Sequence, residues 1–216
     1  MTLDTSRRRV LYLIGATGAT GSVAAAGSHD DDDGSDRSDD QGDHGEDRDD
    51  DEDEDEDRDD RHDGELNEAD VRFLQMMIPH HEQATEMAEL VLGRTNRSEL
   101  CALAEEVIEA QEAEMGTMEE WLETHGHDPH DHEMDHDEMD GMLTDEAMDE
   151  LAAAEGDEFD RLFLSGMIHH HEGAIVMAED VLAEGEDGDV RQLAEEVIEV
   201  QEAEIETMRK WCRDWF

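Results

Sequence analysis

Two short motifs place histidine imidazoles next to methionine thioethers. The first reads Met-Ile-Pro-His-His-Glu, from Met77 to Glu82, and the second reads Met-Ile-His-His-His-Glu, from Met167 to Glu172. Imidazole nitrogen and thioether sulfur together are the ligands that soft ions such as Cu(I) and Ag(I) prefer. The motifs therefore predict a binding site for a soft metal ion.

Both motifs belong to an internal repeat. Residues 70–121 align without a gap to residues 160–211, with every position shifted by 90 and about half of the residues identical. Apolar residues recur every three or four positions within each copy, which indicates amphipathic helices rather than strands. Helix-breaking residues at 93–98 and 185–188 divide each copy into two helices. Each copy is therefore predicted to be a helical hairpin, and two hairpins form an all-α, four-helix bundle.

Polar residues interrupt the apolar stripes near the middle of the predicted helices. Antiparallel packing within the first hairpin puts His80 level with Gln111 and Met77 level with Glu114, and the second copy repeats this. With a pseudo-twofold axis along the bundle, both sets face a common interior. Burying such groups without partners costs about 1 to 3 kcal/mol each. They must therefore hydrogen-bond to one another, with the methionines as ordinary packing, or hold an ion.

A di-iron site of the ferritin type is a rival interpretation of these histidines. Such a site needs Glu-x-x-His on two helices. The residues three positions before His80 and His170 are Met77 and Met167, so a sulfur replaces each hard carboxylate oxygen. Iron is therefore disfavoured, although carboxylates remain in the predicted layer.

A second group of soft ligands lies between the two copies. Its members are His125, His127, His130, His132, Met134, His136, Met139 and Met142. The segment is mostly acidic and has no apolar pattern that would make it fold. Alternating His and Met suits a mobile chelator, and the competing interpretation is a charged linker whose histidines are incidental.

The N-terminal residues predict export. A basic run from Arg7 to Arg9 precedes a mildly apolar run that ends in three alanines at Ala26, the order of a signal peptide of the twin-arginine kind. The expected location is extracellular or in the cell envelope. The next segment is nearly all polar and acidic, so it is predicted to be a disordered tether. The expected organisation is a signal peptide (1–26), a tether (27–64), a first hairpin (65–124), a linker (125–143) and a second hairpin with a short leading helix (144–216).

The charge of the chain excludes some partners. Acidic residues number 67 against 15 Lys and Arg, a formal net charge of -52, which would repel nucleic acid and anionic lipid. Because acids cover even ordinary helix faces, adaptation to molar salt is favoured over a surface built to attract cations. The two cysteines rule out a disulfide-dense scaffold and a four-cysteine zinc site.

The repeated pattern Met-Ile-x-His-His-Glu-x-Ala-x-x-Met-Ala, followed by Gln-x-x-Glu-x-x-x-Met-x-x-Trp, resembles the domain-of-unknown-function 305 family over residues 65–216. The resemblance implies a ferritin-like bundle and, through periplasmic members of the CopM type, copper binding. Carried over position by position, it implies as metal ligands Met77, His80, His81, Met87, Gln111, Glu114 and Met118, and then Met167, His170, His171, Met177, Gln201, Glu204 and Met208. His169, where the first copy has Pro79, would add a ligand.

The expected function is an exported protein that binds copper, Cu(I) in preference to Cu(II), with silver as a second ion, for buffering, resistance or transfer. A conventional enzyme is not expected, because no Ser-His-Asp set, Cys-His nucleophile or phosphate loop is recognisable. Two other classes stay open: a metal-dependent oxidoreductase, marked by redox turnover, and a metal-free structural bundle, marked by the absence of tight metal binding. The sequence names no transfer partner and fits a monomer or a homodimer.

Overall fold

The computed structural model describes residues 64–131 and 139–216, which belong to one compact unit, Asp59–Phe216. The predicted signal peptide and almost all of the predicted tether lie outside the described residues. So do three of the candidate linker ligands, His132, Met134 and His136.

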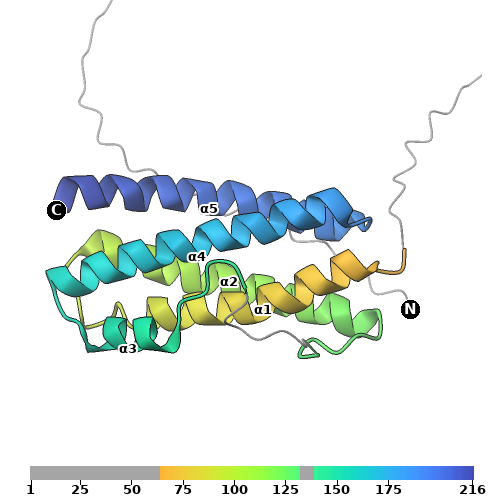
Figure 1. The fold of residues 1–216 in the computed structure, drawn as a ribbon, viewed down its shortest axis with the longest axis horizontal. Coiled ribbons are helices and arrows are strands. Elements are labelled where there is room, and N and C mark those ends of the chain that lie inside the picture. Colours follow the sequence, from red (N-terminus) through yellow and green to blue (C-terminus); the bar gives the residue numbers. More distant parts are fainter. Residues whose placement is uncertain (1–63, 132–138) are drawn as a thin grey trace, which may run out of the picture. The chain divides into compact units, whose positions relative to one another are not determined.

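The described residues form five helices and no strand (Figure 1): α1 (Glu68–Glu89), α2 (Ser98–Thr124), α3 (Asp145–Ala153), α4 (Asp157–Glu184) and α5 (Gly188–Trp215). α1 packs on α2 and α4 packs on α5, while α1 and α4 pack against each other. The predicted all-α, four-helix bundle is confirmed. None of the helices in this part of the chain is long and apolar enough to cross a membrane.

Two of the long helices begin at side chains that accept hydrogen bonds from their first turns. The Asn67 side chain accepts from the backbone N–H groups of Ala69 and Asp70, and the Asp187 side chain does the same at the start of α5. These caps satisfy backbone donors that have no partner inside the helix. The caps thereby fix where α1 and α5 begin. The starting residue in turn sets the height of each later residue along its helix.

α1 and α4 run antiparallel. At the start of α1, Asp70 accepts hydrogen bonds from the backbone N–H groups of Glu186 and Asp187 in the α4–α5 turn, at 3.3 and 3.2 Å. Just before α4, the N–H of Gly156 donates to the carbonyl of Arg94 in the α1–α2 turn, at 2.8 Å. The pseudo-twofold axis therefore lies across the helices, and the expectation that it runs along the bundle is wrong. The histidine motifs still meet because each lies near the middle of its helix.

The apolar core has two halves with a polar layer between them. In α1, Ile78 belongs to the first half and Ala84 to the second, and in α4, Met167 belongs to the second half and Ala174 to the first. The side chains between these limits define the polar layer: His80, His81, Gln111, Glu114, His170, His171, Gln201 and Glu204. The predicted interior layer of polar residues is thus present. Each of the four long helices, α1, α2, α4 and α5, contributes two residues to it.

Candidate metal centre

His80 from α1 and His170 from α4 lie against each other where the two helices meet. Their ring centroids are 3.8 Å apart and the ring planes are inclined by 37°. Burial, followed by the imidazoles of His81, His171 and His169, lowers the pKa of His80 to about 3. Burial, followed by the imidazoles of His80, His171 and His81, places the pKa of His170 well below its ordinary value. Both rings are therefore neutral near pH 7 and can offer a nitrogen lone pair to a cation.

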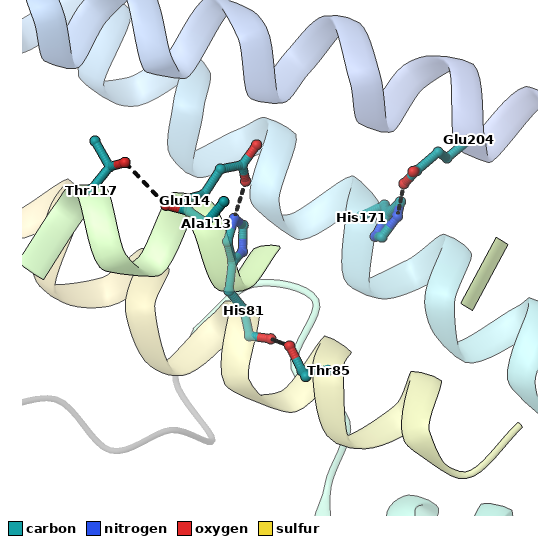
Figure 2. Close-up of polar contacts among 7 residues, drawn as sticks. All are labelled: His81, Thr85, Ala113, Glu114, Thr117, His171 and Glu204. Carbon is teal, nitrogen blue, oxygen red and sulfur yellow. Dashed lines mark hydrogen bonds and ion pairs between the residues drawn. The ribbon is translucent and has the colours of Figure 1, made fainter. Parts of the chain in front are cut away.

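Their chain neighbours, His81 and His171, each contact a carboxylate of the second helix of their hairpin (Figure 2). The Nε2 of His81 lies 2.7 Å from Oε2 of Glu114, and the Nε2 of His171 lies 2.6 Å from Oε2 of Glu204. Both imidazoles are fully buried, whereas the Glu114 and Glu204 side chains are 18% and 10% exposed. Glu114 was expected to lie level with Met77, but it contacts His81, which lies four residues and about one helical turn further along α1. The expected height of Glu114 was therefore wrong by about one turn.

Hydrogen bonding fixes which ring nitrogens are free. The Nε2 of His80 lies 3.2 Å from the backbone carbonyl oxygen of Asp140, which can only accept, so Nε2 carries the proton and donates. An ionised carboxylate likewise only accepts, so His81 and His171 donate through Nε2. The Nδ1 atoms of all three rings are buried without a hydrogen-bond partner, and His170 has no partner on either nitrogen. The layer therefore holds five unpartnered ring nitrogens.

Gln111 of α2 and Gln201 of α5 complete the layer. Both are 3% exposed, and the side-chain oxygen of each is buried without a partner. They line a cavity of about 10 Å³ between α2 and α5, together with Glu114 and Glu204. A space of this size holds at most about one water molecule. The alternative network of His80, Gln111 and Glu114 is not formed, because His80 bonds to Asp140, Glu114 bonds to His81 and the side-chain oxygen of Gln111 has no partner.

The candidate methionines flank the polar layer on both sides. Met77, Met118 and Met177 belong to the first half of the core, and Met87, Met167 and Met208 belong to the second half. All six are at most 8% exposed. Each half of the core therefore contains thioether sulfurs from three different helices.

The described residues of the linker do not gather in one cluster. His125 and His130 are exposed, and the Nδ1 of His125 lies 2.7 Å from the carbonyl oxygen of Trp121. At the other end of the linker, Met139 is buried and Met142 is half-buried against the first half of the core. His169 is exposed as well, so the expectation that it adds a ligand to the layer is not supported.

Comparison with known proteins places the chain in a family. The model of the domain of unknown function DUF305 matches residues 70–212. The chain belongs to the DUF305 family. No curated protein is similar enough to match.

Several solved structures resemble this chain. CopM in its Cu(II)-bound form is 33% identical with a TM-score of 0.60, and the match covers 68% of this chain and 97% of CopM. CopM has also been solved in Cu(I)-bound and Ag-bound forms, at 33% and 34% identity. A DUF305 fragment from Deinococcus radiodurans is 30% identical with a TM-score of 0.63, covering 68% of this chain and 97% of the fragment. A candidate secreted DUF305 protein of Streptomyces coelicolor is 31% identical with a TM-score of 0.58, covering 65% of this chain and 89% of that protein.

The polar layer and the core around it contain two kinds of side chain that can bind a metal ion, imidazoles and thioethers. Among the described residues, no three His, Cys, Asp or Glu side chains are gathered as a ready cation site. Soft ions accept imidazole together with thioether sulfur, and both kinds of side chain are buried in this bundle.

Proposed function

We propose that this protein binds soft metal ions, copper above all and silver as a second ion, in the polar layer of its bundle. The observation that carries the proposal is the set of unpartnered Nδ1 atoms on His80, His81 and His171. Histidines that ligate metals donate their other ring N–H to a carboxylate or a backbone carbonyl, which fixes the tautomer. These three rings have that arrangement before any ion is added.

A purely structural role for the layer leaves its polar atoms unexplained. Each buried donor or acceptor without a partner costs about 1 to 3 kcal/mol, and native proteins rarely keep several together. Five ring nitrogens and two glutamine oxygens in one layer are in this condition. An ion that draws on the imidazoles would offset that cost.

The methionines favour copper and silver over iron. Met77 and Met167 occupy the positions at which a di-iron bundle carries carboxylates, and both are fully buried. Thioether sulfur selects Cu(I) among the common biological ions. The relatives support the same choice, because CopM has been solved with Cu(I), Cu(II) and silver.

We further propose that the linker is a second, more exchangeable copper site and that the protein acts outside the cytoplasm. The linker ligands are His132, Met134, His136, Met139 and Met142. The predicted signal sequence and the description of the Streptomyces coelicolor relative as a candidate secreted protein support export. The role would then be copper buffering, resistance or transfer, with a transfer partner still to be found.

The test is a Cu(I) titration at high salt under reducing conditions, against a competing chelator. A core variant carries Gln at His80, His81, His170 and His171, and a linker variant carries Ser at His132, Met134 and His136. The matched control carries Gln at the exposed His169, which lies outside both the polar layer and the linker. Loss of the tightest site in the core variant alone supports the polar layer.

Three outcomes contradict the proposal in different ways. Loss of tight binding only in the linker variant moves the function to the linker. Failure of the unmodified chain to bind Cu(I) tightly favours a metal-free structural bundle. Sustained consumption of oxygen or peroxide by the copper-loaded chain, beyond that of free copper, identifies an oxidoreductase.

A further inference from the structure

The end of the linker is part of the folded bundle at the level of the polar layer. Met139 packs with the first half of the core, whereas Leu143 packs with the second half. The segment Met139–Leu143, called the strap from here on, therefore spans the polar layer from one half of the core to the other. The strap hydrogen-bonds to α1 and lies against the backbone of α4, and these two helices carry the histidines.

Two glycines let the strap lie directly on the backbone of α4. A Cβ added at Gly173 would overlap the carbonyl oxygen of Asp140, and a Cβ added at Gly141 would lie 2.8 Å from the carbonyl oxygens of His169 and His170. Gly141 also has a φ of +82°, a conformation that other residues rarely adopt. The strap can therefore take this position only while both residues are glycine.

A glutamine fastens the strap to α1. The Gln83 side chain accepts a hydrogen bond from the N–H of Leu143 at 2.7 Å and donates one to the carbonyl of the same residue at 2.9 Å. Gln83 and Gly173 occupy equivalent positions, 90 residues apart, in the two copies of the repeat. The first copy thus binds the strap through the Gln83 side chain. The second copy leaves room for the strap because Gly173 has no side chain.

The strap makes the two central histidines unequal. The Asp140 carbonyl accepts from Nε2 of His80, while His170 has no hydrogen-bond partner on either nitrogen. Without the strap, His80 would lose the acceptor that keeps its proton on Nε2 and its Nδ1 free. Both rings are fully buried with the strap in place.

We propose that the strap is a positioning lid: it orients His80 with Nδ1 toward a bound soft ion, and it covers the layer so that the ion leaves slowly. The inference rests on the proposed metal binding for its second part only. The orientation of His80 is a property of the metal-free protein and can be measured without any ion. The two parts can therefore fail separately.

The experiment compares full-length chains carrying Gly173→Ala, Gln83→Ala or the control Gly116→Ala. The first adds a methyl group where the strap lies, and the second removes both hydrogen bonds from a half-buried side chain without touching the core. Gly116 is an exposed helical glycine with open space around it, so its substitution should only favour the helix. Amide hydrogen exchange of the strap reports whether it has been released.

Two further readouts decide the inference. Nitrogen-15 NMR of the imidazoles gives the tautomer of His80 in the metal-free protein, and transfer of Cu(I) to excess bicinchoninate gives the rate of release. We expect both strap variants to lose the pure Nε2–H tautomer of His80 and to release Cu(I) about tenfold faster or more, the scale on which lost partners of metal-ligating histidines act. The control should match the unmodified chain.

Other results overturn the inference. A strap that is released while the His80 tautomer and the Cu(I) release rate stay unchanged would be a passive part of the linker. Protection of the strap amides that persists in Gly173→Ala would show that the strap does not depend on the glycine contact. If the unmodified chain binds no Cu(I), the proposed function and the retention of the ion both fail, while the His80 tautomer still tests the positioning.

Discussion

The rings of His80 and His170 lie 3.8 Å apart, centroid to centroid, although 90 residues separate them in the chain. They are equivalent residues of the two copies, and the pseudo-twofold axis across α1 and α4 brings them together. His81 and His171 extend the row at ring spacings of 6.5 and 6.3 Å. An ion in the layer would therefore meet nearly equivalent donors from both copies, and the strap is the feature that distinguishes the two sides.

The stability of the metal-free protein should fall on mild acidification because of His80 and His170. Both have a folded-state pKa below the ordinary value of 6.5, so below that pH the unfolded chain binds protons that the folded chain does not. The stabilisation is complete above pH 6.5 and is lost as the pH falls toward the folded pKa. Each ring contributes a slope of up to about 1.4 kcal/mol per pH unit.

Denaturant unfolding in the presence of a chelator, at a series of pH values between about 7 and 5, measures this slope. A variant with Gln at both histidines is the reference, because it keeps all the carboxylates of the unmodified chain. The unmodified protein should lose stability faster than the variant over this range. Equal slopes would mean that the two imidazoles are not held neutral by the fold.

Glu114 and Glu204 should contribute to metal affinity without having to be ligands themselves. Each carboxylate accepts from the Nε2 of a buried histidine and so keeps the Nδ1 of that ring available. Glu114→Gln and Glu204→Gln should each weaken Cu(I) binding by about 10- to 100-fold, as is usual for partners of metal-ligating histidines. Glu112→Gln, an exposed change on α2, is the control for altered charge. Competition titration gives the affinities, and a loss as large in Glu112→Gln would assign the effect to surface charge.

The sequence was sufficient to predict the bundle and most of the polar layer. The repeat and its periodicity determine which residues of α1, α2, α4 and α5 face inward, and polar residues on an apolar stripe must lie in the interior. The direction of the pseudo-twofold axis was not predictable in this way. His80 and His170 lie near the middle of their helices, so they come together whether α1 and α4 run parallel or antiparallel. Periodicity alone also left the level of Glu114 uncertain by a turn, since the loop length sets it.

The strap was missed because its contacts are between backbone atoms, which leave no hydrophobic pattern. A signal was nevertheless present in the repeat. Gln83 and Gly173 differ within an otherwise well-matched stretch, and glycine in the middle of a helix carries a cost of about 1 kcal/mol relative to alanine. Such a glycine indicates that another part of the chain approaches closely.

Arg97 forms ion pairs with two carboxylates, and the two pairs should differ sharply in their contribution to the free energy of unfolding. Asp160 contacts the guanidinium at 2.7 Å with a side chain that is 3% exposed, whereas Asp157 contacts it at 3.1 Å and is 76% exposed. Asp160→Ala should lower the free energy of unfolding by about 1.5 to 3 kcal/mol, the range for hydrogen bonds to charged groups. Asp157→Ala should lower it by less than about 1 kcal/mol, because water already solvates that pair. Denaturant unfolding of both variants checks the ranking, and equal losses would mean that burial does not set the strength of these pairs.

The acidic surface should make the folded state depend on salt. Like charges on exposed helix faces repel one another, and the screening length falls from about 10 Å at 0.1 M salt to about 3 Å at 1 M. On α2 the exposed acids include Glu105, Glu106 and Glu112, none of which needs to be charged for packing. The thermal midpoint of the metal-free protein should therefore rise steadily with KCl. A variant with Gln at these three positions should be more stable at low salt and less sensitive to added KCl.

The opposite result would change the interpretation of the acidic surface. If the thermal midpoint of the unmodified chain does not change with salt, the acids serve another purpose than tolerance of a saline habitat, and attraction of cations toward the polar layer becomes the better explanation.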